Sequence, residues 1–253
     1  MSEGAFKRVM HVAGGSFLLY TGGTLLWNAL FGEVGRGPLS RALTKTDDAP
    51  ARLIPADVRA RLVKVRSVED RGNVVAGLIH QYGEDAKMHV LAGQILGRQC
   101  ATGHCVPEKN WPAEVRELFR YVRKNVRYMR DPLNMDTFNS PWRTLQMRSG
   151  DCGNVTVLLG ALLEASGYPV ALRIIQTTDS PGGANHIYNL AGLPPNAPTA
   201  WAPLDASMDV QPGWEAPGAS EVARAGYGSS GITARVWTRS ADGRWSVTAA
   251  PKK

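Results

Sequence analysis

The sequence contains few cysteines, no internal repeat and no recognisable nucleic-acid-binding motif. Three cysteines in 253 residues are too few for a scaffold built on disulfides. Charged residues make up only 20% of the chain and apolar residues 43%, which favours a globular protein with a sizeable core over a disordered one. The net charge of +7 favours anionic partners such as a membrane surface, a nucleic acid or a cell-wall polymer, without choosing among them.

Two of the cysteines, Cys100 and Cys105, lie close together with His104 between them. They would either form a disulfide and leave Cys152 free, bind a metal together with His104, or remain unpaired thiols in a turn. No fourth ligand follows at the spacing of a zinc site. The residues alone leave these three arrangements open.

An N-terminal stretch from Val9 to Phe31 contains no Asp, Glu, Lys or Arg. As a helix it would span roughly 34 Å, enough for the core of a bilayer. His11, Asn28 and four glycines weaken this hydropathy signal. A signal peptide and a helix buried against a partner protein are the alternatives, although no clear cleavage site follows. We predict that residues 1–31 form a hydrophobic segment that anchors the chain to a membrane or associates with one.

Composition divides the rest of the chain into four parts. Residues 32–56 are rich in Gly, Pro and charge, which predicts a linker. Residues 57–110 show helical patterning, and residues 111–215 contain the predicted core domain. Residues 216–253 form a predicted C-terminal extension with a β-hairpin around Ser-Ala-Asp-Gly.

The predicted elements run from helices to strands along the chain. Helices are expected around residues 74–79, 88–95, 112–126 and 151–166, and strands at 170–177, 186–191, 200–206, 232–239 and 244–249. The helix at 151–166 is apolar on all sides after its first turn, which predicts a buried central helix. Residues 131–150, with their prolines and polar residues, indicate a long ordered loop. This order of elements favours an α+β fold.

Cys152 lies where a loop meets the start of the buried helix, in Gly150-Asp151-Cys152. The positive end of a helix dipole and its free N–H groups favour a thiolate over a thiol. The same N–H groups stabilise an oxyanion that forms on a substrate carbonyl. The position therefore suits a nucleophile, whereas a lone cysteine is more often a small buried apolar residue.

Two further residues strengthen the nucleophile interpretation. His186 begins a predicted strand, and Asp205 lies near the end of the next one. If the two strands pair as neighbours, a histidine base and an orienting carboxylate lie on one face of the sheet. Cys152 on the abutting helix would then complete a catalytic triad.

These motifs together resemble the transglutaminase-like superfamily. The block Gly-Asp-Cys opens an apolar helix that ends Leu-Leu-Glu-Ala-Ser-Gly-Tyr-Pro-Val, and His-Ile-Tyr and Leu-Asp-Ala-Ser follow in order. The upstream pieces Val-Arg-Tyr-Met-Arg-Asp-Pro and Phe-Asn-Ser-Pro-Trp-Arg-Thr-Leu resemble, more narrowly, transglutaminase-like proteins of phage and prophage genomes. The resemblance covers about residues 112–214. It implies a papain-like core with the cysteine on a central helix and the histidine and aspartate on adjacent strands.

Carried over to this sequence, the resemblance makes Cys152 the nucleophile, His186 the base and Asp205 the orienting acid. No motif fixes the upstream donor of the oxyanion hole, so its candidates are the backbone N–H of Cys152 and the side chains of Asn139 and Gln146. Many relatives have acidic residues directly after the cysteine, where this chain has Gly-Asn. No cofactor and no metal are predicted.

The predicted function is acyl transfer through a thioester at Cys152. With water as acceptor the protein is a cysteine peptidase or amidase that acts on peptide, protein or cell-wall substrates such as peptidoglycan peptides. With an amine as acceptor it is a transglutaminase. The alternative is a non-enzymatic structural protein of a virion or membrane complex that contacts phage virion proteins. A metal site formed by Cys152, His186 and Asp205 matches no metal motif. A membrane-associated or virion-associated location is favoured over a soluble cytoplasmic one.

Overall fold

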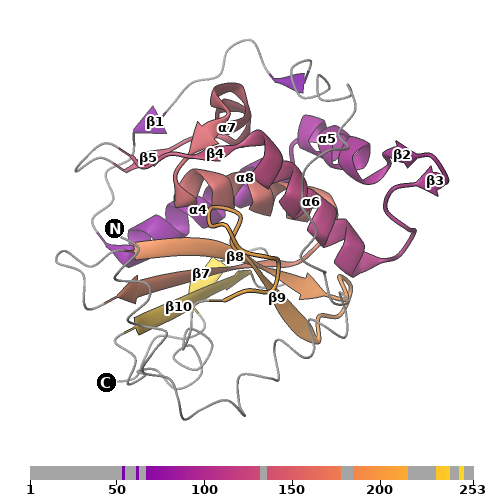
Figure 1. Ribbon diagram of the computed structural model, residues 1–253. Coiled ribbons are helices and arrows are strands. Elements are labelled where there is room, and N and C mark those ends of the chain that lie inside the picture. The colour runs from indigo at the N-terminus through magenta and orange to yellow at the C-terminus, as the bar shows by residue number, and fades with distance from the viewer. Residues whose placement is uncertain are drawn as a thin grey trace. The chain divides into compact units, whose positions relative to one another are not determined.

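The computed structural model (Figure 1) describes residues 53–54, 61–62, 67–131, 136–177, 185–215, 232–239 and 245–247. All of them belong to one unit of the chain, Ser40–Lys253. Within this part, five helices cover one face of a five-stranded antiparallel sheet. The predicted α+β fold, with N-terminal helices, a central helix and an antiparallel sheet, is confirmed.

The main sheet has the strand order β11-β10-β7-β8-β9. Its strands are β7 (Val170–Thr177), β8 (Asn185–Leu193), β9 (Ala200–Leu204), β10 (Ile232–Arg239) and β11 (Trp245–Val247). Every neighbouring pair is antiparallel. Pro203 lies in β9, at the edge of the sheet, where its missing N–H interrupts no ladder.

Three two-stranded pairs complete the strands. They are β1 (Arg61–Leu62) with β5 (Thr137–Phe138), β2 (Gln99–Cys100) with β3 (Gly103–His104), and β4 (Arg127–Tyr128) with β6 (Ser149–Gly150). Only the last of these pairs is parallel. Its second strand, β6, lies directly before the central helix α8 in the chain.

The helical layer is built around one buried helix, α8. The helices are α4 (Val68–Gly83), α5 (Ala86–Leu96), α6 (Trp111–Asn125), α7 (Pro141–Met147) and α8 (Cys152–Ala165). The other four helices pack against α8, which also contacts β8 and β7. Every residue from Cys152 to Leu163 is buried, as the all-apolar pattern predicts. Gly160 permits the closest contact, because a Cβ there would lie 2.5 Å from Cδ1 of Ile79 on α4.

The predicted long loop at 131–150 is wrong in part, since it contains helix α7 and strands β5 and β6. Ser140 caps α7 by accepting a 3.1 Å hydrogen bond from the backbone N–H of Arg143. Pro141 occupies the first turn, where a missing N–H costs nothing. Trp142 and Leu145 bury the inner face of the helix. The prolines and polar residues thus mark a helix start rather than a loop.

The C-terminal hairpin is part of the main sheet. β10 pairs with β11, as the hairpin prediction requires, but it also pairs with β7 from Ile232↔Thr177 to Thr238↔Ala171. The grouping of residues 216–253 as an extension beyond the core therefore differs from the structure. Because β9 and β10 are far apart in the sequence, the pairing of β10 with β7 cannot be predicted from neighbouring segments.

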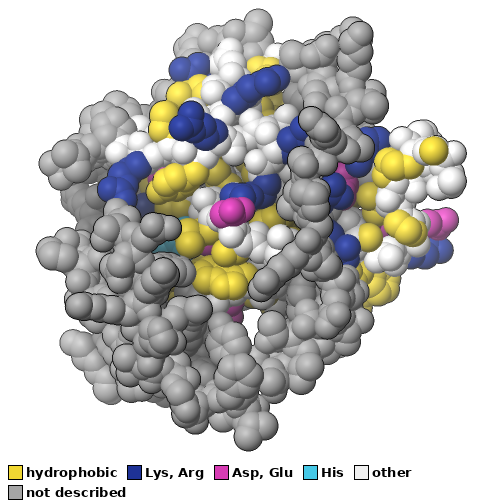
Figure 2. All heavy atoms as spheres, in the orientation of Figure 1, with side chains coloured by type: hydrophobic (Ala, Val, Ile, Leu, Met, Phe, Trp, Pro, Cys, Tyr) yellow, Lys and Arg dark blue, Asp and Glu magenta, His cyan; other side chains and the backbone are white. Residues whose placement is uncertain are grey.

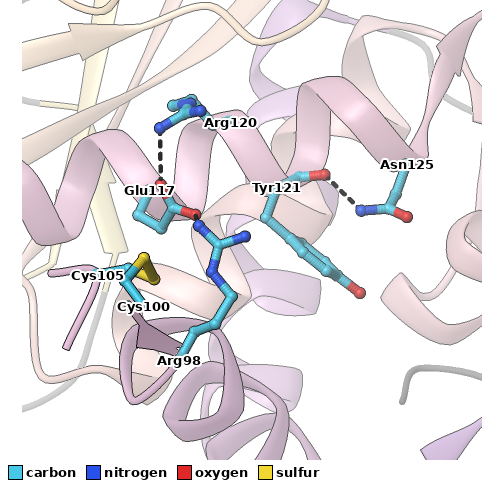
Figure 3. Close-up of polar contacts among 7 residues, drawn as sticks. All are labelled: Arg98, Cys100, Cys105, Glu117, Arg120, Tyr121 and Asn125. Carbon is cyan, nitrogen blue, oxygen red and sulfur yellow. Dashed lines mark hydrogen bonds and ion pairs between the residues drawn. A yellow bond between two sulfur atoms is a disulfide. The ribbon is translucent and has the colours of Figure 1, made fainter. Parts of the chain in front are cut away.

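Cys100 and Cys105 form a disulfide across the short hairpin of β2 and β3. The metal site and the unpaired thiols are therefore wrong, and Cys152 is the free cysteine. Figure 3 shows the disulfide beside α6. Next to it Arg98 forms a 2.7 Å ion pair with Glu117, and the N–H of Cys105 donates to the carbonyl oxygen of Arg98. These contacts fasten the hairpin to the helical layer.

The N-terminal predictions concern a different part of the chain. Residues 1–31 and the predicted linker, apart from Leu53 and Ile54, lie outside the described residues. Among the described helices, none combines the length and the apolarity needed to cross a bilayer. Membrane association through Val9–Phe31 stays a prediction.

A buried carboxyl group, Glu164, lies near the end of α8. Its Oε2 is 3.7 Å from Nδ1 of His80 on α4 and 3.6 Å from Nη1 of Arg239 on β10. Burial raises the pKa of Glu164 to about 7, Arg239 opposes the rise, and Glu84 adds to it. Three elements of the fold therefore meet at a carboxyl group that takes up a proton near neutral pH.

Glu164→Gln is expected to flatten the pH dependence of stability. The folded pKa of Glu164 lies above its ordinary value of 4.5, so the stability gained from its proton is complete below pH 4.5 and lost as the pH rises through 7. The difference in unfolding free energy between pH 4.5 and 8, measured by urea denaturation, should shrink by roughly 2–3 kcal/mol. Glu108→Gln, at an exposed carboxylate that does not influence the pKa of Glu164, should change it little. An unchanged pH dependence in Glu164→Gln would contradict the assignment.

Candidate active site

Cys152 is the first residue of α8, at the predicted junction of loop and helix. Asp151 caps the helix, and its Oδ1 accepts a 2.9 Å hydrogen bond from the N–H of Asn154. The N–H groups of Cys152 and Gly153 precede the first acceptors inside the helix, so they have no intrahelical partner. The sulfur therefore lies beside backbone donors at the positive end of a helix dipole, and the side chain is 8% exposed.

His186 and Asp205 form the second part of the site. His186 is the second residue of β8, and Asp205 directly follows β9. The two strands pair up to Asn189↔Leu204, so Asp205 lies diagonally across from His186 on the same face of the sheet. Nε2 of His186 and Oδ2 of Asp205 are 2.5 Å apart. The structure thus brings together the pair that the sequence predicted.

Asp205 is held rigidly in place. It is 1% exposed, and its second oxygen, Oδ1, accepts hydrogen bonds from the N–H of Ser207 at 3.2 Å and from its Oγ at 2.7 Å. Each carboxylate oxygen therefore has its own donors: Ser207 for Oδ1 and His186 for Oδ2. This division fixes the orientation of the carboxylate and, through it, that of the imidazole ring.

The electrostatics link His186 to Cys152 as well as to Asp205. Burial lowers the pKa of His186, but hydrogen bonds with the side chains of Asp205 and Cys152, and the charges of both groups, raise it to about 10. Because Nε2 faces Asp205, Nδ1 is the ring nitrogen that remains to exchange a proton with the sulfur. His186 therefore keeps its proton at neutral pH, beside the cysteine.

A buried cross-link sets the distance between the nucleophile helix and the histidine strand. Oγ1 of Thr156, one turn after Cys152, donates a 3.0 Å hydrogen bond to the carbonyl oxygen of Ile187. Nδ2 of Asn189 donates at 3.0 Å to the carbonyl oxygen of Thr156. A Cβ at Gly160 would lie 2.9 Å from Oδ1 of Asn189, so glycine makes room for this amide. Helix and strand are thereby joined next to Cys152 and His186.

Asn189→Leu is expected to lower kcat by about 100-fold, because small displacements of reacting groups carry penalties of that size. The change leaves the Thr156 carbonyl without its side-chain donor and α8 less firmly held to β8. Thr156→Val should act in the same direction, and Thr156→Ser, which keeps the hydroxyl, should largely restore kcat. KM should change little in all three variants. A loss of stability with unchanged kcat would show that the cross-link is merely structural.

Comparison with known protein families gives a match that includes the same three residues. The model of the transglutaminase-like superfamily matches residues 98–206, a stretch that contains Cys152, His186 and Asp205. The chain therefore carries a transglutaminase-like domain. The predicted resemblance to this superfamily is confirmed at that level. Among the curated proteins, none matches the sequence.

Several solved structures are distantly similar to the chain. A candidate cysteine protease of Cytophaga hutchinsonii is 16% identical, with 74% of this chain and 57% of that chain covered and a TM-score of 0.39. A candidate protease of Parabacteroides distasonis is 13% identical, with 72% and 31% covered and a TM-score of 0.40. LapG of Legionella pneumophila is 16% identical, with 59% and 78% covered and a TM-score of 0.32. The chain thus spans little more than half of the first protein and about a third of the second.

The two predicted oxyanion-hole side chains occupy different positions in the transglutaminase-like domain. Asn139 is buried beside the first turn of α8, where its N–H donates a 2.6 Å hydrogen bond to Oδ1 of Asn154. Gln146 is exposed on α7, and its Oε1 accepts from Nη1 of Arg143. In the described part of the chain, no hydrogen bond joins either side chain to Cys152. The backbone N–H of Cys152 is the candidate donor nearest to the sulfur.

Two residues near the nucleophile received no role in the sequence-based prediction. Burial raises the pKa of Asp151 to about 6, opposed by its hydrogen bond from the N–H of Asn154. Burial and then the charge of Cys152 raise the pKa of Tyr128, opposed by a hydrogen bond with Arg130. An aspartate directly before an apolar helix is a recognisable cap signal. Nothing in the sequence pattern placed Tyr128 beside Cys152.

Within the described ranges, potential metal ligands do not gather into a metal site. No group of three or more His, Cys, Asp and Glu side chains among the described residues is arranged to hold a metal ion. The metal site considered for Cys152, His186 and Asp205 therefore has no structural support there. The three side chains instead form a linear relay, in which His186 contacts both of the others.

Proposed function

We propose that this protein is a cysteine-dependent enzyme that hydrolyses amide bonds in peptides or proteins. The observation that carries the proposal is the relay of Cys152, His186 and Asp205, with the sulfur at a helix start and the carboxylate 1% exposed. A thiol nucleophile, a base and a group that orients the base are the parts that acyl transfer requires. The transglutaminase-like domain supports a thiol-dependent enzyme in general.

The first half-reaction would form a thioester. The Cys152 thiolate attacks the carbonyl carbon of the substrate, and backbone N–H groups at the start of α8 donate to the oxyanion. The carbon–nitrogen bond then breaks as Nδ1 of His186 gives its proton to the leaving amine. Asp205 keeps the imidazole oriented and compensates its positive charge.

The second half-reaction would release the acid. Neutral His186 takes a proton from water, and the oxygen attacks the thioester carbonyl carbon. The carbon–sulfur bond breaks, which regenerates the thiolate and the protonated imidazole. An amine in place of water would make the protein a transglutaminase. Water has the advantage because it is always present, and peptidoglycan peptides are among the substrates of this proposal.

The Cys100–Cys105 disulfide supports an oxidising location. Disulfides persist in secreted, periplasmic or surface proteins and are rare in the reducing cytosol. We therefore propose that the protein works in or beyond a cell envelope, in line with a cell-wall or protein substrate. The narrower resemblance to phage and prophage proteins and a virion location stay predictions.

The disulfide also makes a clean test available. Because Cys100 and Cys105 are paired, one equivalent of iodoacetamide without reductant should alkylate Cys152 alone. Peptide mixtures incubated with the protein in ¹⁸O-water should yield new amino termini and ¹⁸O-labelled carboxylates, detected by mass spectrometry. Alkylation of Cys152 and the variant Cys152→Ala should both abolish these products.

A labelled primary amine in a parallel reaction distinguishes the acceptor. Its incorporation in preference to ¹⁸O would assign transglutaminase activity to the same site. Products that survive alkylation and persist in Cys152→Ala would contradict any role for this thiol. Cys100→Ser/Cys105→Ser, which retains Cys152, is the matched control and should keep its activity while folded.

A further inference from the structure

Two exposed segments lie side by side immediately before the nucleophile. They are residues 127–130 and residues 146–149, and we call them together the arginine rim. The N–H of Arg127 donates to the carbonyl oxygen of Arg148, and that of Met129 to the carbonyl oxygen of Gly150, both at 2.9 Å. β4 and β6 pair in this stretch, with Tyr128 opposite Gly150. The second segment then continues through Asp151 into Cys152, so the arginine rim borders the reacting sulfur.

The arginine rim exposes an unusual share of large apolar side chains. Tyr128, Met129 and Met147 are 49%, 50% and 41% exposed. They account for half of the large hydrophobic side chains that are exposed among the described residues. Tyr128 is close enough to Cys152 for the two groups to interact electrostatically. Clustered exposed apolar side chains beside a reactive group are typical of a binding surface.

The same rim is positively charged. Arg127, Arg130 and Arg148 are exposed, and the two segments contain no Asp or Glu. In the described part of the chain, none of the three forms an ion pair with a carboxylate, whereas Arg71, Arg98 and Arg123 each do. Figure 2 shows Lys and Arg side chains next to hydrophobic ones on the face of the molecule that it draws. The guanidinium groups of Arg127 and Arg148 are thus available to an external anion, and that of Arg130 also forms a hydrogen bond with the side chain of Tyr128.

Arg148 occupies a position that usually selects another residue. It follows α7 with φ 53° and ψ 27°, in the left-handed region where helix ends favour glycine or asparagine. Backbone strain of this kind is common at binding sites. The guanidinium group of Arg148 thus belongs to the residue whose backbone pairs with Arg127.

We propose that the arginine rim binds the part of a peptide substrate next to the scissile amide and selects acidic residues beside an apolar one. This inference rests on the proposed function of Cys152. Guanidinium groups recognise carboxylates through paired hydrogen bonds. Tyr and Met side chains adapt to an apolar neighbour. Arginines with an exposed tyrosine also suit nucleic acid, but a peptide is favoured because the surface borders a thiol that acts on acyl groups.

The test compares fluorogenic peptides that differ only in charge. Each carries one apolar residue at the cleavage site, flanked by Asp/Glu, by Asn/Gln or by Lys. Wild-type protein should show a kcat/KM about tenfold higher for the acidic peptide than for the neutral one. This estimate assumes that each of the three exposed arginines contributes about two- to threefold. The preference should arise mainly in KM and should weaken at high salt.

The decisive variant is Arg127→Gln/Arg130→Gln/Arg148→Asn, in which asparagine suits the left-handed conformation. It should lose the preference while its hydrolysis of the neutral peptide still depends on Cys152. Arg130→Gln alone, which leaves the backbone contacts of the rim unchanged, should lose part of it. Lys87→Gln/Lys109→Gln/Arg120→Gln removes the same charge elsewhere and should keep the preference.

The outcomes separate this inference from the proposed function. Peptide hydrolysis without a charge preference, or a preference that survives in the rim variant, overturns the role of the rim and leaves Cys152 chemistry intact. The absence of any Cys152-dependent hydrolysis overturns the proposed function itself, and the inference with it. Rim-dependent binding of a fluorescent single-stranded oligonucleotide, without a peptide charge preference, would assign the surface to nucleic acid and overturn the inference.

Discussion

His186→Ala is expected to lower kcat for peptide hydrolysis by on the order of 10⁵–10⁶-fold, the size of effect seen when a triad base is removed. Nδ1 of His186 is the group that can protonate the leaving amine and later deprotonate water. Its pKa of about 10 also means that the ring carries a positive charge beside Cys152 at neutral pH. The variant therefore loses both the proton transfer and the charge that stabilises the thiolate.

Two measurements check this prediction. Alkylation of Cys152 by iodoacetamide at pH 6–7 should slow by about tenfold or more in the variant, because the positive charge that the imidazole places beside the sulfur is lost. The kcat of the wild type should fall as the pH rises through about 10, where His186 loses the proton that the leaving amine needs. His104→Ala, at an exposed histidine of the β2–β3 hairpin, should leave both quantities unchanged. A loss of less than tenfold in kcat would contradict the role of His186.

Asp205→Asn is the second change with a large expected effect, a loss of about 10⁴-fold in kcat. The asparagine oxygen can accept both hydrogen bonds from Ser207, which turns its NH₂ group toward Nε2 of His186. Nε2 must then accept a hydrogen bond, so the single proton of the neutral ring lies on Nδ1. The ring can no longer take a proton from the thiol or from water.

The readout for Asp205→Asn is the pH profile together with kcat. The variant should lose the high pKa of His186, since Asp205 is the largest of the influences that raise it. NMR of the imidazole should therefore show titration at lower pH. Asp209→Asn, at a fully exposed aspartate four residues further on, is the matched control and should retain wild-type kcat. An unchanged His186 titration would show that the carboxylate does not control the ring.

The sequence was sufficient to predict the fold and the position of the relay. The apolar run after Cys152 predicts a buried helix, and the aliphatic and β-branched runs after it predict strands that can pair as neighbours. Strand pairing then places His186 and Asp205 on one face without any knowledge of their side-chain contacts. The catalytic roles of the three residues stay predictions until they are tested by substitution.

Other features depend on contacts that no local pattern encodes. The pairing of β10 with β7 joins segments separated by the whole of β8 and β9. The Thr156–Asn189 cross-link uses polar residues inside otherwise apolar elements. A pattern of hydrophobicity shows that these residues are polar but does not predict which partner they bind. Tyr128 reaches Cys152 through a parallel pair of two-residue strands, too short to leave a periodic signal. Each of these is a tertiary effect that overrides local propensity.

The strand order has a consequence for the time course of synthesis. β7 needs β10 as its second neighbour, and β10 ends at Arg239, long after Asp205 has been made. A nascent chain that already contains all three residues of the relay therefore still has an unpaired edge along β7. Unpaired edges of this kind recruit other strands and promote aggregation. Translation must thus extend past the hairpin strand before the ribosome-bound domain can close its own sheet.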